Sequence, residues 1–164
     1  MLSPEYRAQL AQLHADKGDF GTSSAMYAGI VRKLIAEHKP RQLLDFGCGK
    51  MALKPFVDCV YIPYDPAIAG IDAKPAQADM VVCTDVLEHV EPEYLDSVMD
   101  ELQRVTRNVG FFVVHTGPAM NHLPDGRNAH LIQEPPEWWL PKIVQRWKLI
   151  TFQRWPNGFF VVVA

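Results

Sequence analysis

The sequence predicts an α/β fold with a doubly wound, mostly parallel sheet that closes in an antiparallel hairpin. Short, almost wholly apolar runs alternate with a helical pattern, as is typical of strands buried on both faces of a parallel sheet. The last two runs are instead joined by Pro156, Asn157 and Gly158, which is a hairpin signal. The length of 164 residues indicates one domain over 1–164, with helices over 1–40 and the core over 41–164.

Two helices are expected before the first strand. Ser3 is a suitable N-cap for the first helix, which ends near Gly18, and a turn over 19–21 follows. Thr22 or Ser23 caps the second helix. Its apolar stripe is expected to consist of Met26, Tyr27, Ile30, Val31, Leu34 and Ile35.

Apolar runs and helical spacing place the remaining elements. Parallel strands are expected at 42–46, 58–62, 79–83 and 110–115, and the hairpin strands at 149–155 and 159–163. A helix begins at Pro92 and ends near Asn108, because five apolar residues follow Pro92 at helical spacing. A further helical stretch opens at Pro135 and is expected to break or bend at Pro141.

Composition excludes several classes of protein. The chain is 48% apolar and 21% charged, which is ordinary for a globular protein, and no apolar run approaches the roughly 20 residues of a membrane span. Three cysteines are too few for a disulfide scaffold, and no signal peptide is visible, so a reduced, cytoplasmic setting is expected. Residues 1–101 carry 9 basic and 16 acidic side chains, and residues 102–164 carry 7 and 3. Because the basic side chains are scattered, nucleic acid is disfavoured as a partner without being ruled out.

The segment over 43–50 is the most informative part of the chain. An apolar strand ends in Asp45 and runs into Gly47, Cys48 and Gly49, where glycines allow a sharp turn and a close approach to a ligand. In open α/β sheets, ligands bind beyond the carboxyl ends of the strands. Asp65 follows the second strand and is placed to accept hydrogen bonds from ribose hydroxyls. This arrangement predicts a nucleoside cofactor.

The acid within the loop discriminates between two cofactors. Asp45 precedes the first glycine by two residues, so its carboxylate would repel a pyrophosphate and suits an ammonium beside a sulfonium. The loop therefore favours S-adenosylmethionine over NAD. NAD stays an alternative, because the third-glycine position of the dinucleotide pattern holds Ala52, which that pattern allows.

Two segments resemble class I S-adenosylmethionine-dependent methyltransferases. Residues 43–49 resemble motif I of that family, and residues 78–90, with the string Asp-Val-Leu-Glu-His, resemble the fourth-strand motif of its small-molecule branch (type 11/12-like). The resemblance covers about residues 20–164 and implies a Rossmann-like sheet of seven strands. It implies that the loop holds the methionine end of the cofactor and that Asp65 holds its ribose. The cofactor-binding residues expected on this basis are Asp45, Gly47, Cys48, Gly49, Asp65, Pro66, Thr84 and Asp85.

The chain departs from the family pattern at one edge of the sheet. Only residues 66–78 separate Asp65 from the next strand, which is too short for a complete helix and strand. The third strand is therefore expected to be missing, or reduced to residues 68–72, which puts the adenine side of the cofactor site in doubt. A second copy of the chain could cover the depleted edge, so a homodimer is a possible assembly.

Candidate residues for the acceptor follow the later strands. The loop over 115–130 carries more polar side chains than a plain connector requires, and a base is needed where the acceptor must lose a proton. The candidate catalytic residues are His89, His115 and His130, and the candidate substrate-binding residues are Asn121, His122, Arg127, Asn128 and Trp138. Trp138 would stack on a planar substrate, although a core role is more common for such a residue. No metal is expected, because three histidines with Asp125 match no compact ligand spacing.

These features together predict a methyltransferase. The expected reaction is methyl transfer from S-adenosylmethionine to an oxygen or nitrogen of a small or exposed acceptor. The alternative is a non-catalytic module of the same fold that holds S-adenosylmethionine or a nucleoside, which the shortened edge favours. Replacement of Asp45 by Ala is expected to abolish cofactor binding.

Overall fold

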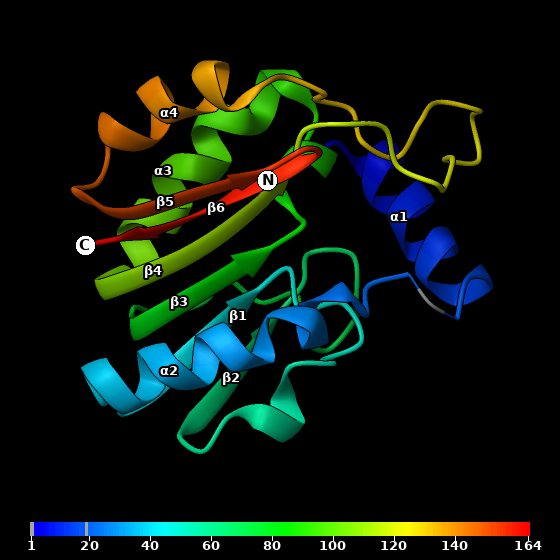
Figure 1. The fold of residues 1–164 in the computed structure, drawn as a ribbon. Helices are drawn as coiled ribbons and strands as arrows, with labels where there is room; N and C mark the ends of the chain where they lie inside the picture. The colour runs from blue at the N-terminus through cyan, green and yellow to red at the C-terminus, as the bar shows by residue number, and fades with distance from the viewer. Residues whose placement is uncertain (1, 19) are drawn as a thin grey trace.

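A six-stranded sheet forms the centre of the computed structural model, which describes residues 2–18 and 20–164 (Figure 1). The strand order is β2-β1-β3-β4-β6-β5; the first four strands are parallel, and β6 runs antiparallel to β4 and β5. The strands are β1 (Gln42–Phe46), β2 (Val60–Tyr64), β3 (Ala78–Thr84), β4 (Thr106–His115), β5 (Leu149–Trp155) and β6 (Gly158–Val163). The predicted fold class, with its closing hairpin, is confirmed.

Helices cover both faces of the sheet. They are α1 (Pro4–Asp16), α2 (Ala28–His38), α3 (Leu95–Val105) and α4 (Pro136–Val144). Figure 1 shows α3 and α4 on one face, α2 on the other, and α1 beyond the ends toward which the strands β1 and β3 point. The N-cap of α1 is confirmed, because the hydroxyl of Ser3 accepts a hydrogen bond from the Tyr6 N–H at 3.1 Å.

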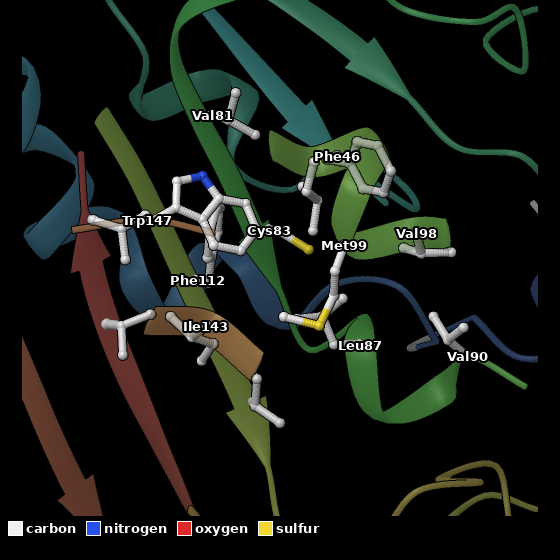
Figure 2. Close-up of a cluster of buried hydrophobic side chains, with 14 of the residues drawn as sticks. Phe46, Val81, Cys83, Leu87, Val90, Val98, Met99, Phe112, Ile143 and Trp147 are labelled. Carbon is white, nitrogen blue, oxygen red and sulfur yellow. The ribbon is translucent and has the colours of Figure 1, made fainter. Parts of the chain in front are cut away.

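The core consists of two apolar layers separated by the sheet. One layer joins α3 and α4 to the sheet, and Figure 2 shows Met99, Phe112, Ile143 and Trp147 meeting there. The other layer packs α2 against the opposite face of the same strands. Because both faces are covered, the buried parts of the central strands β3 and β4 are almost wholly apolar, over residues 80–83 and 109–114.

Several element boundaries differ from the predictions. The strand expected at 58–62 lies at 60–64, and the helix expected to end near Asn108 ends at Val105 because β4 already begins at Thr106. A 3₁₀ turn over Ser23–Tyr27 precedes α2, so neither Thr22 nor Ser23 stands at the start of that helix. Within the expected stripe, Met26 is wrong, since it is 72% exposed.

Two further predictions concern the first turn and the last helix. Phe20 and Gly21 lie in a turn, as expected, whereas Asp19 lies outside the described residues. Pro141 sits inside α4, which runs on through it to Val144.

The segment between β2 and β3 forms turns in place of a third strand. The Asp65 N–H donates to the Ile71 carbonyl at 3.0 Å, so the chain folds back on the end of β2. Across the described ranges no seventh strand is present, and β2 forms one edge of the sheet. The reduced edge is confirmed, and the homodimer stays a prediction. No helix in the described part of the chain is long and apolar enough to cross a membrane.

Candidate active site

A cleft of about 780 Å³ opens at the carboxyl ends of β1, β2, β3 and β4. The ends of these strands form its floor, and residues of α1, of the segment 20–26 and of the loop 117–121 form its walls. Its volume falls within the range of about 300–1,000 Å³ that is typical of cofactor and substrate sites. The cleft therefore lies where the sequence placed the ligand.

The glycine loop (residues 47–49) is packed too closely for side chains. Gly47 and Gly49 have positive φ angles of 76° and 50°. A Cβ on Gly47 would collide with Val86, and one on Gly49 would lie 2.5 Å from the Gly21 carbonyl oxygen. The glycines are thus required by protein contacts, and they leave the backbone of the loop bare along the cleft.

Cys48 between them is unsuited to nucleophilic chemistry. Its side chain is almost fully buried, and this burial raises the pKa of its thiol to about 12. Its N–H and that of Gly47 both donate to the Tyr64 carbonyl, which ties the loop to the end of β2.

Asp65 lines the cleft beside the glycine loop. One carboxylate oxygen accepts from the Gly49 N–H at 3.1 Å and the other from the Ala67 N–H at 2.9 Å. Each oxygen can accept more than one hydrogen bond, so both can still receive ribose hydroxyls. Pro66 also lines the cleft, and His14 of α1 lies with its Nε2 3.9 Å from the carboxylate.

Asp45 is placed differently from the prediction. Its side chain is 1% exposed and is absent from the described lining of the cleft, and its Oδ2 accepts from the Tyr61 hydroxyl at 2.6 Å. Burial raises the pKa of Asp45 to about 6, with the Tyr61 hydrogen bond acting in the opposite direction. The prediction was that this carboxylate would bind the ammonium group of the cofactor. In the structure its partner is the Tyr61 hydroxyl.

Asp85 and His115 form a polar pair across the cleft floor. Asp85 has φ of 56°, which is a rare conformation for a residue other than glycine and is typical of functional positions. Its Oδ1 lies 3.5 Å from Nε2 of His115 and 3.3 Å from the Tyr27 hydroxyl. Burial and the neighbouring Asp85 raise the pKa of Tyr27, which stays a hydrogen-bond donor. Thr84 is buried next to them at the end of β3 and also lines the cleft.

His89 and His130 lie beside this pair with their rings 4.6 Å apart. Nδ1 of His89 is 2.8 Å from the Ala129 carbonyl, and Nδ1 of His130 is 2.6 Å from the Gly117 carbonyl. Burial lowers the pKa of both rings, that of His89 to about 3, so both are neutral at pH 7. Since a carbonyl only accepts, each Nδ1 carries the proton and each Nε2 keeps a lone pair.

Comparison with known proteins agrees with this geometry. Residues 61–114 match the family model described as a methyltransferase domain. Among solved structures, a DhpI complex with S-adenosylhomocysteine (SAH) aligns at 18% identity and a TM-score of 0.59, covering 98% of this chain and 93% of that one. The Burkholderia thailandensis 1,6-didemethyltoxoflavin-N1-methyltransferase, with its substrate and SAH bound, aligns at 14% identity and a TM-score of 0.66, covering 99% and 90%. Residues 61–114 are thus similar to a methyltransferase domain, and the chain has the fold of these solved methyltransferase structures.

A third structure has the same fold. The magnesium protoporphyrin IX methyltransferase of Synechocystis PCC 6803, with SAH bound, aligns at 12% identity and a TM-score of 0.60, covering 86% of this chain and 82% of that one. No protein of curated function matches the chain. The resemblance to class I methyltransferases noted in the sequence is thus confirmed, whereas the acceptor is a separate question.

The structure brings only part of the predicted acceptor set to the cleft. His89, His115, Asn121 and His130 line it, whereas the other predicted substrate residues do not. These others are His122, Arg127, Asn128 and Trp138. Asn128 instead holds the loop together, since its Oδ1 accepts from the N–H groups of Ala119 and His130.

The remaining members of that set have other partners. His122 bridges Asn128 within the loop, and Arg127 pairs with Asp125 at 2.7 Å on the surface. Trp138 packs against Trp139 on α4 and carries the Lys142 ammonium over its ring. The loop's polar residues thus serve mainly its own conformation, which sequence spacing alone does not reveal.

Three residues of the cleft region were missed by sequence reasoning. His14 and Tyr27 come from the N-terminal segment, and their position depends on long-range packing that leaves no local pattern. Glu88 sits within the string Asp-Val-Leu-Glu-His, and only the structure distinguishes it, because its side chain is completely buried. A buried carboxylate needs an explanation, because an acidic side chain is rarely fully buried without a partner.

Proposed function

We propose that this methyltransferase transfers a methyl group from S-adenosylmethionine to an oxygen or nitrogen of a small or exposed acceptor. The observation that carries the proposal is the cleft itself, which is lined by a bare glycine loop, by Asp65 and by the Asp85–His115 pair. Structures of the same fold were determined with SAH, and DhpI also with S-adenosylmethionine, which supports this cofactor. We also propose that residues 1–164 act as one domain, since α1 contributes a wall of the cleft.

The residues present fit the proposed cofactor. The bare backbone of the glycine loop leaves room for the methionine end, and the free lone pairs of Asp65 suit the ribose diol. When bound, S-adenosylmethionine supplies an electrophilic methyl group on a positively charged sulfur. Three acidic residues, Asp45, Asp65 and Asp85, lie at the ends of β1, β2 and β3, and their negative charge favours a cationic ligand over a pyrophosphate.

His115 is the best-placed base among the three predicted histidines. Its Nε2 faces Asp85, which orients the ring and stabilises the cation formed when Nδ1 takes a proton. His89 and His130 donate their Nδ1–H groups to carbonyls and are harder to protonate because of their burial. The chain's main contribution is to hold the acceptor in line with the methyl group, and His115 removes its proton.

The alternative is a module that binds S-adenosylmethionine without turnover. The observation that favours it is the folded-back segment over 66–77, which leaves the edge of the sheet beside Asp65 without a third strand. The two functions share the cofactor and differ only in methyl transfer. They are therefore separable by experiment.

Calorimetric titration of the purified chain with S-adenosylmethionine, SAH and NAD is the first test. Heat with the first two and none with NAD is expected. Label transfer from tritiated S-adenosylmethionine to fractionated small molecules is the second test, with His115→Asn as the catalytic variant. Transfer that is lost in His115→Asn supports the enzyme, and binding without any transfer supports the alternative. Heat with NAD alone would contradict both.

The setting and the assembly of the protein are also proposals. All three cysteines are free, and Cys48 and Cys83 are buried, which fits a reducing compartment such as the cytoplasm. The exposed edge strand β2 supports the expected homodimer, because an unpaired strand edge is a surface for pairing.

A further inference from the structure

Two histidines of the cleft lining and one glutamate buried behind them lie close together. Glu88, His89 and His130 each offer a potential ligand atom, and these three atoms lie within 4.8 Å of one another. Glu88 and His89 follow β3, and His130 comes from the long loop after β4, so the group is assembled from distant parts of the chain.

The two imidazoles are oriented as metal ligands are. Each Nδ1–H donates to a backbone carbonyl, of Ala129 for His89 and of Gly117 for His130, which leaves both Nε2 lone pairs available. Metal-bound histidines nearly always make such a hydrogen bond through the other ring nitrogen, because it fixes the tautomer and the ring plane. The edge-on ring contact at 4.6 Å brings the two imidazoles close together.

Glu88 supplies an independent indication that something is bound. Its side chain has no exposed surface, its Oε1 accepts from the His115 N–H at 2.9 Å, and its Oε2 has no hydrogen-bond partner in the described structure. Leaving a buried carboxylate oxygen unpaired is costly, so a buried atom of this kind calls for a partner. A cation beside Oε2 would satisfy it, whereas a proton on Glu88 is the competing explanation.

We propose that Glu88, His89 and His130 form a binding site for a divalent first-row transition-metal ion on the floor of the cleft. Two imidazoles and one carboxylate suit Zn²⁺, Mn²⁺, Fe²⁺ or Co²⁺ better than Mg²⁺ or Ca²⁺, which prefer oxygen ligands. A point equidistant from atoms 4.8 Å apart lies about 2.8 Å from each, so side-chain shifts of less than about 1 Å reach the usual ligand distances of about 2.0–2.2 Å.

The open positions of this ion face the space where the acceptor is expected. His89 and His130 line the cleft, whereas Glu88 is buried behind them, so the free coordination positions point into the cavity. An acceptor with a hydroxyl or carboxylate oxygen would be held there. This second step rests on the proposed methyl transfer, whereas metal binding itself does not.

The test is a titration of the full chain, freed of metal by dialysis against a chelator and carrying no histidine tag, with CoCl₂. The visible absorption of bound Co²⁺ and calorimetry with ZnCl₂ are expected to show one ion per chain. Glu88→Gln and His130→Asn are each expected to weaken binding at least about tenfold. His38→Asn is the control, because this exposed histidine ends α2, which lies against the sheet away from the cleft.

Each outcome separates the two proposals. The metal site is overturned if the wild type binds no ion, as a protonated Glu88 would require, or if Glu88→Gln and His130→Asn bind it as tightly as His38→Asn does. Circular dichroism and thermal unfolding of each variant show whether it folds. If Glu88→Gln fails to fold, His130→Asn carries the test. Metal binding without S-adenosylmethionine binding would leave the site standing and remove the proposed reaction.

Discussion

The hydrogen bond between Asp45 and Tyr61 distinguishes two acidic residues that look alike in the sequence. Both Asp45 and Asp65 end apolar strands, and their position at the carboxyl edge of the sheet was predictable from strand periodicity. Of the two, only Asp65 lines the cleft, whereas the Asp45 carboxylate accepts a hydrogen bond from Tyr61 on the neighbouring strand. Sequence spacing places a residue on an edge of the sheet, but it does not show which neighbour its side chain contacts.

Asp45→Asn is expected to change the pH dependence of stability. The folded-state pKa of Asp45 is raised to about 6, above the value of about 3.9 in an unfolded chain, so the folded protein binds this proton more tightly. That contribution to stability is complete below about pH 4 and is lost as the pH rises through 6. Between pH 4 and pH 8, the free energy of unfolding of the wild type should therefore fall by about 2–3 kcal/mol relative to that of Asp45→Asn.

Urea unfolding of both proteins at several pH values measures this difference. Asp58→Asn is the matched control, since Asp58 is exposed. A stability difference that stays constant over the whole pH range would show that Asp45 titrates normally in the fold.

Asp65→Asn is expected to weaken cofactor binding. An amide keeps one acceptor oxygen but loses the charge and half of the acceptor capacity, and hydrogen bonds to a charged group contribute about 1.5–3 kcal/mol. Calorimetry with SAH should show a loss of about tenfold or more. Asp72→Asn on the same segment, where Asp72 forms an exposed ion pair with Arg7, should bind like the wild type. Equal affinity in the two variants would remove Asp65 from the proposed site.

At the scale of elements, α1 is a helix whose residues the sequence predicts but whose packing position it does not. Its start at Ser3 was predictable from capping chemistry, whereas its docking depends on contacts 80 or more residues away along the chain. Ser3 bonds Glu91 through both its N–H and its hydroxyl, at 2.8 and 2.6 Å, and the Tyr6 hydroxyl donates to the His89 carbonyl. These bonds hold α1 against the segment that follows β3, and His14 of α1 lines the cleft.

Ser3→Ala is expected to loosen α1 and to destabilise the protein by about 1 kcal/mol, because it removes the N-cap and one bond to Glu91. Hydrogen exchange of the α1 amides and thermal unfolding measure the effect. Ser3→Thr should behave nearly as the wild type does, since threonine also caps helices. If α1 amides in Ser3→Ala stay as protected as those in Ser3→Thr, the cap does not hold the helix.

At the scale of the whole molecule, the two apolar layers explain why the fold class was predictable. The burial of β3 and of residues 109–114 in β4 produces continuous apolar runs, and the hairpin of β5 and β6 carries a turn signal, so both features are visible locally. The convergence of Glu88, His89 and His130 was not predictable. It depends on the path of a long loop that has almost no regular structure.

Leu102→Ala is expected to cost about 2–5 kcal/mol of folding free energy, because Leu102 is fully buried between α3 and the sheet. Denaturant unfolding measures this cost. Ile150→Ala on β5 is the control, since Ile150 is half exposed and should change stability by well under half as much. Comparable losses in both variants would contradict the layered core.

The position of Leu2 in the lining of the cleft has a practical consequence. A tag or fusion partner attached ahead of it would be joined to the chain close to the proposed sites of cofactor and acceptor. The other terminus is free of this problem, because Ala164 pairs with Lys148 next to the end of β6 that lies opposite Gly110 of β4, away from His115 and the cleft. Affinity handles and immobilisation chemistry for this protein therefore belong at its carboxyl end.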